Sequence, residues 1–219
     1  SDIDPEHRWI LAPLAAHHWD SYDIAFPAHA RTLNTGYNST SGTALKAAVQ
    51  AALPDDRIVP IAAAALEPRR VTLGDQRCAS ARHVLDARGS GDFSALECGW
   101  QKFLGQRLTV VGGHGLTRPM VMDATVDQLD GYRFVYCLPF DAETVFVEDT
   151  YYSDTRNIDP PRLRQRIADY AAARGWQVTA TGGEEMGALP VVMAGDFDAL
   201  WPADDDVARI GVRAGVFQA

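Results

Sequence analysis

Hydrophobic and polar positions alternate along the middle of the chain, in segments bounded by turn residues. Alternation with a period of two is typical of strands, and short turns between such strands favour antiparallel pairing. Asp130-Gly131 is one of these turn signals. The pattern predicts an antiparallel β-sheet made of WQKFLGQRLTVV, RPMVMDATV, GYRFVYCLPF and TVFVEDTYY, with a last strand near ALPVVMA.

One helix is predicted to interrupt this sheet. Asp159 is a typical capping residue, Pro160 and Pro161 suit a first helical turn, and Gly175 is a typical helix end. Apolar residues recur between them at helical spacing. The spacing predicts a buried stripe of Leu163, Ile167, Tyr170 and Ala171.

The first part of the chain has a different texture. Asp4 and Pro5 predict the start of a helix that Pro13 limits to a short one, and residues 40–56 predict a second helix with an apolar stripe. One strand is expected near 22–26, and three short strands are expected between 57 and 86, near RIVPIAAAAL, RRVTLG and ARHVLDA. The whole chain therefore reads as α/β with α+β character.

The segment VLDARG ends an expected strand with Asp86, Arg88 and Gly89. An apolar strand that runs into a glycine turn is one way in which α/β proteins bring their backbone close to a phosphate. Most strands that end in glycine simply turn. Both interpretations stay open from these residues alone.

Composition and charge exclude several function classes. With 47% hydrophobic and 22% charged residues, the 219-residue chain is typical of a soluble globular protein. Its net charge of −9, without a Lys/Arg cluster, argues against nucleic acid and against a basic membrane-binding face. Cys78, Cys98 and Cys137 stand far apart, so we interpret them as reduced thiols of a cytosolic protein rather than metal ligands.

Aromatic residues gather on one face of the strand GYRFVYCLPF. Tyr132, Phe134 and Tyr136 share this face with Leu138 and Phe140. The commoner arrangement would pack such a face as core against the helix over 160–174. The alternative is the wall of an apolar ligand pocket.

Two adjacent acids stand in the next strand, VFVEDTYYS. Alternation puts Glu148 and Asp149 on opposite faces, and the loop length decides which of them meets the aromatic wall. An even-numbered loop pairs Phe134 with Asp149, and an odd-numbered loop pairs Tyr136 with Glu148. A carboxyl buried there has a raised pKa and can donate a proton at neutral pH.

Other chemistry finds little support. The adjacent His17 and His18 cannot place both rings on one face of a regular element, and the sequence shows no metal-ligand spacing and no glycine elbow around a hydroxyl nucleophile. Arg118 and Arg133 suit either an anion site or ion pairs with nearby acids.

Across nearly its whole length, the chain resembles the bacterial lycopene β-cyclases of carotenoid biosynthesis. The resemblance rests on HRWILAPLAAHHW, RTLNTGY, VLDARG, GWQKFLGQ, HGLTRPMVMDATVDQLDGYRFVYCLPF, VEDTYYSD, DYAAARGW, EEMGALPV and GVRAGVF. The long central block and the E-D-T triplet are specific. VLDARG and GVRAG are shared more widely among related flavoproteins.

The resemblance implies a hydroxylase-like flavoprotein fold, similar to p-hydroxybenzoate hydroxylase and geranylgeranyl reductases. On this basis residues 1–95 would form part of an FAD-binding domain, residues 96–196 an antiparallel-sheet substrate domain, and residues 197–219 a return segment to the FAD domain. The glycine-rich G-x-G-x-x-G turn of such folds does not occur in the sequence. We therefore expect a central piece of the enzyme that binds little FAD and is inactive alone.

The implied reaction is the non-redox cyclisation of the ψ-ends of lycopene to β-ionone rings, giving β-carotene through γ-carotene. It needs FAD reduced by NAD(P)H. By resemblance, Glu148 would be the acid, Asp149 its electrostatic partner, and Tyr132, Phe134 and Tyr136 the wall that faces the polyene. Asp86, Arg88 and Gly89 would lie near the flavin.

The resemblance also implies a bacterial cytoplasmic protein in peripheral contact with the membrane, since lycopene resides in bilayers. Two other hypotheses stay open. One is a flavin monooxygenase or polyprenyl reductase on the same scaffold, and the other is a carotenoid or lipid carrier without catalytic activity. Only the cyclase requires an acid carried on a strand beside the aromatic wall.

Overall fold

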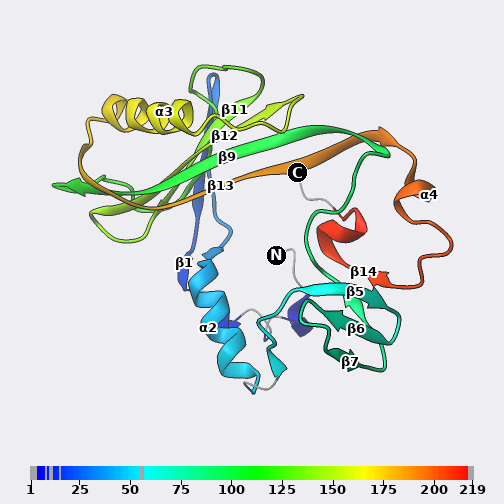
Figure 1. The fold of residues 1–219 in the computed structure, drawn as a ribbon. Helices are drawn as coiled ribbons and strands as arrows, with labels where there is room; N and C mark the ends of the chain where they lie inside the picture. Colours follow the sequence, from blue (N-terminus) through cyan, green and yellow to red (C-terminus); the bar gives the residue numbers. More distant parts are fainter. Residues whose placement is uncertain (1–3, 8, 10–11, 15, 55–56, 217–219) are drawn as a thin grey trace. The chain divides into compact units, whose positions relative to one another are not determined.

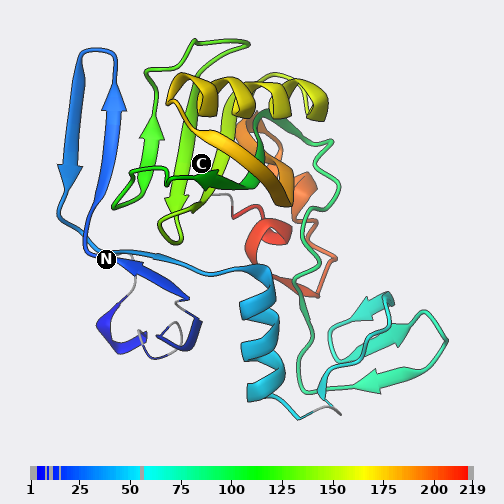
Figure 2. The same cartoon turned by 90° about the vertical axis from the view of Figure 1, so that its left-hand side faces the viewer.

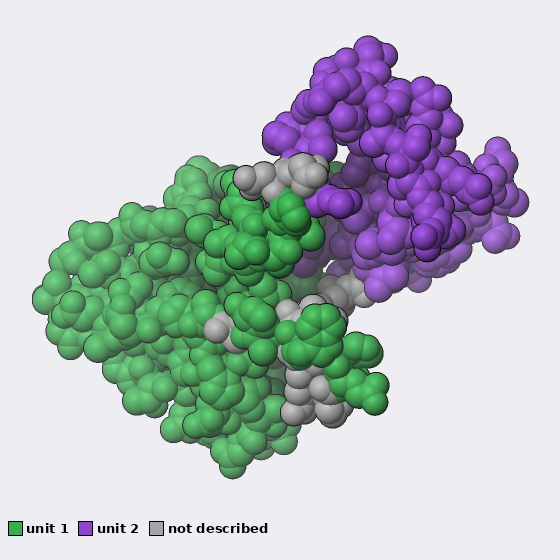
Figure 3. Space-filling model, turned by 90° about the horizontal axis from the view of Figure 1, so that it is seen from below, with its two compact units in different colours: residues 1–54, 101–188 green, residues 55–100, 189–219 purple. Residues whose placement is uncertain are grey.

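The computed structural model describes residues 4–7, 9, 12–14, 16–54 and 57–216. The chain divides into two compact units (Figure 3). One unit comprises residues 1–54 and 101–188, and the other comprises residues 55–100 and 189–219. The architecture is mixed α/β and mostly sheet, as the sequence predicts.

A seven-stranded sheet runs through the first unit (Figures 1 and 2), in the order β13-β9-β12-β11-β10-β2-β3. The pairs β10–β11 and β11–β12 are antiparallel, as expected. β2 forms a further antiparallel pair with β3, which the sequence did not predict, and pairs with β10 in parallel. The strands are β2 (Tyr22–Phe26), β3 (His29–Leu33), β9 (Leu96–Val111), β10 (Met120–Asp123), β11 (Arg133–Pro139), β12 (Thr144–Ser153) and β13 (Gln177–Gly195).

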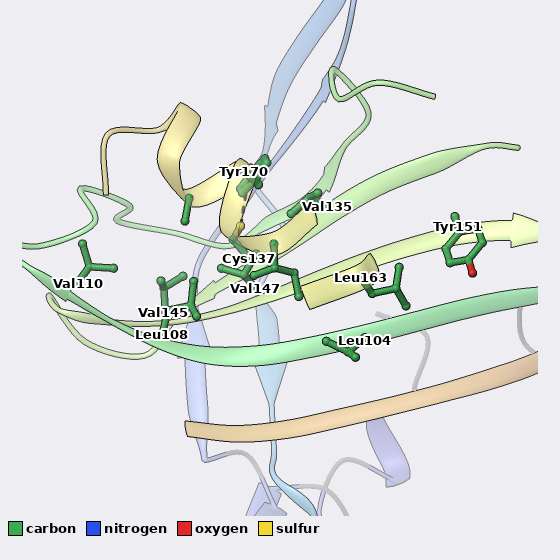
Figure 4. Close-up of a cluster of buried hydrophobic side chains, with 12 residues drawn as sticks. Leu104, Leu108, Val110, Val135, Cys137, Val145, Val147, Tyr151, Leu163 and Tyr170 are labelled. Atoms are coloured by element: carbon green, nitrogen blue, oxygen red, sulfur yellow. Dashed lines mark hydrogen bonds between the residues drawn. The ribbon is translucent and has the colours of Figure 1, made fainter. Parts of the chain in front are cut away.

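Helix α3 (Pro160–Ala173) packs on one face of this sheet and closes the hydrophobic core (Figure 4). It begins as predicted, with the Asp159 side chain accepting a hydrogen bond from the backbone N–H of Arg162, and its predicted stripe is buried. The core joins that stripe to apolar residues of the sheet, namely Leu104, Leu108, Val110, Val135, Cys137, Val145, Val147 and Tyr151.

The face of β11 that meets α3 is therefore the one that carries Val135 and Cys137. The expectation that Tyr132, Phe134 and Tyr136 pack against this helix is wrong. Side chains alternate along a strand, so these three residues lie on the opposite face of the sheet. Small β-branched and thiol side chains let the helix approach closely, and the bulky rings remain for the other side.

A short sheet and a helix complete the first unit. β1 (His17–Trp19) pairs antiparallel with β4 (Tyr37–Ser39). Helix α2 (Gly42–Ala52) begins at Ser41, whose hydroxyl accepts from the N–H of Ala44, but its expected apolar stripe stays largely exposed at Leu45 and Val49. Where a helix is expected after Asp4, the structure has 3-10 turns at Pro5–His7 and Ala12–Leu14 and an α-helical conformation at Trp9, and residues 8, 10 and 11 lie outside the described residues.

The second unit contains two small sheets. β5 (Ala63–Glu67), β6 (Arg70–Leu73) and β7 (Cys78–Ser80) form an antiparallel sheet. The third strand expected near ARHVLDA is instead the two-residue β8 (Leu85–Asp86), which pairs in parallel with β14 (Ala208–Arg209). Helix α4 (Phe197–Leu200) and a 3-10 turn at Gly211–Ala214 complete this unit.

These units differ from the expected boundaries at 95 and 196. Residues 1–54 belong with the large sheet, because β2 and β3 extend it beyond β10. Sequence periodicity cannot show this, since the pairing of β2 with β10 joins segments about a hundred residues apart.

None of the helices in the described part of the chain is long and apolar enough to cross a membrane.

Close contact between β9 and β12 depends on Gly105. A Cβ added to Gly105 would lie 2.1 Å from Cζ of the Phe146 ring. We expect Gly105→Ala to lower the free energy of unfolding by about 1–3 kcal/mol, because the ring must leave its position. Gly182→Ala is the control, since its added Cβ meets no atom within 4 Å. Urea denaturation measures both, and equal stability of the two variants would contradict this packing.

Candidate active site

The register between β11 and β12 decides which acid meets the aromatic face. Tyr136 lies opposite Glu148, and Val135 lies opposite Asp149. Glu148 therefore shares a face with the aromatic residues, and Asp149 points to the side of α3. Of the two registers left open by the sequence, the structure has the one that pairs Tyr136 with Glu148.

Glu148 is only partly accessible to solvent. The hydroxyl of Thr150, two residues along the same strand face, donates a 2.8 Å hydrogen bond to its Oε1. Burial raises the pKa of Glu148 to about 7, the Thr150 hydrogen bond opposes the rise, and the charges of Glu185 and Asp149 add to it. A carboxyl with this pKa carries a proton part of the time at neutral pH, as a general acid must.

An aromatic cluster begins at Tyr136, which lies opposite Glu148. The Tyr136 hydroxyl contacts the hydroxyl of Tyr37 from β4, and their ring centroids are 6.2 Å apart. Tyr37 in turn lies against Trp19 at 6.2 Å and meets Tyr22 edge-on at 5.8 Å. The strands β1, β2 and β4 thus add rings to the face that β11 provides.

The other two predicted wall residues lie further along β11. Phe134 is buried, whereas 41% of Tyr132 is exposed. The Tyr132 ring lies 5.9 Å from that of Phe134 and 6.1 Å from that of Tyr152, and its hydroxyl donates to Met122 Sδ at 3.1 Å. The structure thus brings Phe134 and Tyr136 onto the face of Glu148, with Tyr132 at its margin.

Asp149 is fully buried on the helix side of the sheet. Its Oδ2 accepts from Nε of Arg133 at 2.8 Å and also from Nη2, and Arg166 Nη1 lies 3.6 Å from its Oδ1. Burial raises the pKa of Asp149, and the guanidinium groups of Arg133 and then Arg166 oppose that rise. Its contacts are those of a structural ion pair, and Arg133 is an ion-pair residue rather than an anion site.

In the second unit, Asp86, Arg88 and Gly89 form a compact cluster with Arg213. Asp86 is buried and accepts two 2.8 Å hydrogen bonds from Arg88 and one 2.8 Å bond from Arg213. These bonds, led by that of Arg88, hold the pKa of Asp86 well below its usual range. Gly89 has a φ of 72°, and the space where a Cβ would lie is open.

This cluster fits an anionic group. The guanidinium of Arg88 is half-exposed, so it presents donors outward while Asp86 fixes its plane. The left-handed turn at Gly89 leaves room for close approach to the backbone. Among the described residues, no group of three or more His, Cys, Asp or Glu side chains could hold a metal ion.

Sequence reasoning missed Tyr37 and Thr150 around Glu148. Thr150 had a signal, since the alternation that orients Glu148 puts residue 150 on the same face. Tyr37 had none, because its approach to Tyr136 joins positions 99 residues apart through the pairing of β1 with β4. The Arg133–Asp149 pair likewise depends on a register that the sequence left open.

Comparison with known proteins gives consistent matches over the whole chain. The family model described as Lycopene cyclase protein matches residues 2–219. Lycopene beta-cyclase of Pantoea ananas is 42% identical over 214 residues, which cover 98% of this chain and 56% of that protein. Lycopene beta-cyclase of Pseudescherichia vulneris is 42% identical over 217 residues, which cover 99% of this chain and 56% of that protein. The chain spans about half the length of these curated relatives.

Among the solved structures, a protein with a similar fold over most of this chain illustrates the likeness. It is described as peptidyl tryptophan dihydroxylase QhpG, essential for tryptophylquinone cofactor biogenesis. The TM-score is 0.55 at 16% sequence identity, over 91% of this chain and 46% of that chain. At this identity the likeness concerns the fold alone.

Removal of the Asp149 carboxylate should be severely destabilising. We expect Asp149→Ala to lower the free energy of unfolding by about 3–5 kcal/mol, because it leaves Arg133 charged and buried without its counter-ion. The control is Arg162→Ala, which removes the ion pair between Arg162 and Asp130. Both side chains of this pair are about half exposed, so the substitution should lower the free energy of unfolding by at most about 1 kcal/mol. Chemical denaturation compares the two variants. If Asp149→Ala lowered the free energy of unfolding by no more than the control does, the structural role of Asp149 would be contradicted.

Proposed function

The chain belongs to the lycopene cyclase protein family, and we propose that the complete enzyme cyclises the open ends of lycopene to β-ionone rings without net redox change. The observation that carries this proposal is a partly buried glutamic acid, Glu148, with a pKa of about 7 on an aromatic sheet face. The names of the relatives support lycopene as the substrate.

Glu148 is the proton donor in this proposal. Its carboxyl transfers a proton to the terminal alkene of the polyene, and the two electrons of that double bond form the new C–H bond. A tertiary cation remains, an internal double bond attacks it to close the ring, and a base removes a ring proton. The proton count balances, so the reaction is an isomerisation.

The rings on the face of Glu148 suit this chemistry. Tyr136 and Phe134 present π-faces that stabilise a desolvated cation by about 1–2 kcal/mol each. Their bulk also keeps water away from the cation, which water would otherwise capture. Tyr132 lies at the exposed margin of the same face, where a long hydrocarbon would enter.

Asp149 acts through the strand rather than on the substrate. Its ion pair with Arg133 fixes the orientation of β12 and therefore the face to which Glu148 points. Its negative charge also adds to the raised pKa of Glu148. We therefore assign Asp149 as a positioning residue and Glu148 as the acid.

FAD is the cofactor that we propose for the complete enzyme. Arg88 and the turn at Gly89 would bind an anionic part of it, and Asp86 holds Arg88 and Arg213 in place for this role. When bound and reduced by NAD(P)H, the flavin would supply negative charge, which favours a developing cation. Peripheral contact with the membrane follows from a substrate that dissolves in bilayers.

Replacement of the acid tests this function. In lycopene-accumulating bacteria that express the complete enzyme, we expect Glu148→Gln to lower the yield of γ-carotene and β-carotene at least about 100-fold, because a general acid contributes about 100- to 10,000-fold. The amide keeps the size of the side chain and cannot donate the proton. Pigment extraction and chromatography measure the products.

Glu143→Gln is the matched control, because Glu143 is exposed in the turn between β11 and β12. It should leave the yield unchanged. A Glu148→Gln enzyme that still cyclises lycopene at the wild-type rate would refute the assignment of Glu148 as the acid. A complete wild-type enzyme that forms no cyclised product would refute the proposed function and favour a redox enzyme on the same scaffold.

A further inference from the structure

Tyr37 reaches the proposed acid from a distant part of the chain. It lies in β4, and its hydroxyl contacts that of Tyr136 although 99 residues separate them. The rings of Trp19 and Tyr22 pack against Tyr37 and restrict its movement. The hydroxyl contact is therefore held in place from the Tyr37 side by the strands β1, β2 and β4.

Tyr136 is the residue closest in register to Glu148. The two face each other across β11 and β12 on the same side of the sheet, where opposed Cβ atoms are about 4.5–5.5 Å apart. A phenol hydroxyl can donate a hydrogen bond to a carboxylate. In the described part of the chain, however, the hydrogen bond to the Glu148 carboxyl comes from Thr150, and the Tyr136 hydroxyl contacts Tyr37.

A tyrosine has a single O–H to donate. We propose that the Tyr136 hydroxyl donates its O–H to the hydroxyl of Tyr37. Tyr37 is then a positioning residue for the acid, because it withholds this donor from Glu148 and so keeps the proton on the carboxyl. The role of Tyr37 in catalysis rests on the proposed function of Glu148 as the acid. The effect of Tyr37 on the hydrogen bonding of Tyr136 does not depend on that function.

The electrostatics agree with this arrangement. A hydrogen bond donated to a carboxylate stabilises the charged form and lowers its pKa. The pKa of Tyr37 is raised by burial and by the charges of Glu148 and Tyr22, so Tyr37 stays a neutral phenol where Glu148 titrates. The titratable groups that the structure places near Glu148 are Tyr37 on β4, Tyr136 on β11, Glu185 on β13 and Asp149 on β12.

The test is a titration of Glu148 by NMR in the complete protein, with 13C-labelled glutamate carboxyls. The Glu148 signal is identified as the one that Glu148→Gln removes. Tyr37→Phe frees the Tyr136 hydroxyl to donate to Glu148, so we expect its pKa to fall by roughly 1–2 pKa units from about 7. Tyr22→Phe, which changes a neighbouring ring of the same cluster, should leave it unchanged.

Two further variants separate this effect from a loss of packing. Tyr136→Phe removes the donor itself, so the pKa of Glu148 should stay at or above its wild-type value. The double variant Tyr37→Phe/Tyr136→Phe should restore the value that Tyr37→Phe lowers. A packing defect would not be reversed by a second substitution.

In the complete enzyme, the decline of kcat/KM at high pH should move to lower pH in Tyr37→Phe, because the acid must be protonated. An unchanged or higher Glu148 pKa in Tyr37→Phe, or no recovery in the double variant, overturns the inference. If Glu148→Gln retained full cyclase activity, the proposed function would fail, and the NMR titration would still decide the role of Tyr37.

Discussion

The buried ion pair between Arg133 and Asp149 fixes how β12 presents its two acids. A shift of one residue would reverse every side chain of the strand, placing Glu148 in the core beneath α3 and Asp149 among the rings. A pair of this kind adds little net stability, but a register that separates its charges inside the protein is strongly disfavoured. The pair therefore specifies the face on which Glu148 lies, which is the face that carries the aromatic rings.

The two acids are neighbours in sequence with opposite electrostatic surroundings. Asp149 has two guanidinium groups close to it, whereas Glu148 has a hydroxyl, a half-buried aromatic face and the negative charges of Glu185 and Asp149. Burial without a cation favours the neutral carboxyl. The same sheet thus holds a structural anion on one side and the proposed proton donor on the other, in line with the general pattern that paired acids divide their roles by environment.

Local patterns predicted much of the first unit. The cap, the proline start and the buried stripe of α3 follow from residues close in sequence, and the alternation around Glu148 and Asp149 places them on opposite faces. Features that depend on distant pairing could not be predicted. These include the addition of β2 and β3 to the sheet, the approach of Tyr37 to Tyr136, and the face of β11 that meets α3. Each is decided by packing between segments whose separate patterns allow more than one solution. The register of β11 with β12 also stayed open, because it depends on the conformation of the turn that joins them.

The chemistry proposed for the aromatic face requires Glu148 to hold a proton near neutral pH. Infrared spectroscopy of the protein as a function of pH, with Glu148→Gln as the reference, measures this most directly. A carboxylic acid C=O band that is absent from Glu148→Gln should be present below pH 7 and decline as the pH rises through about 7, since deprotonation converts the acid to a carboxylate. A Glu148 band already lost near the ordinary glutamate pKa of about 4.3 would contradict the account.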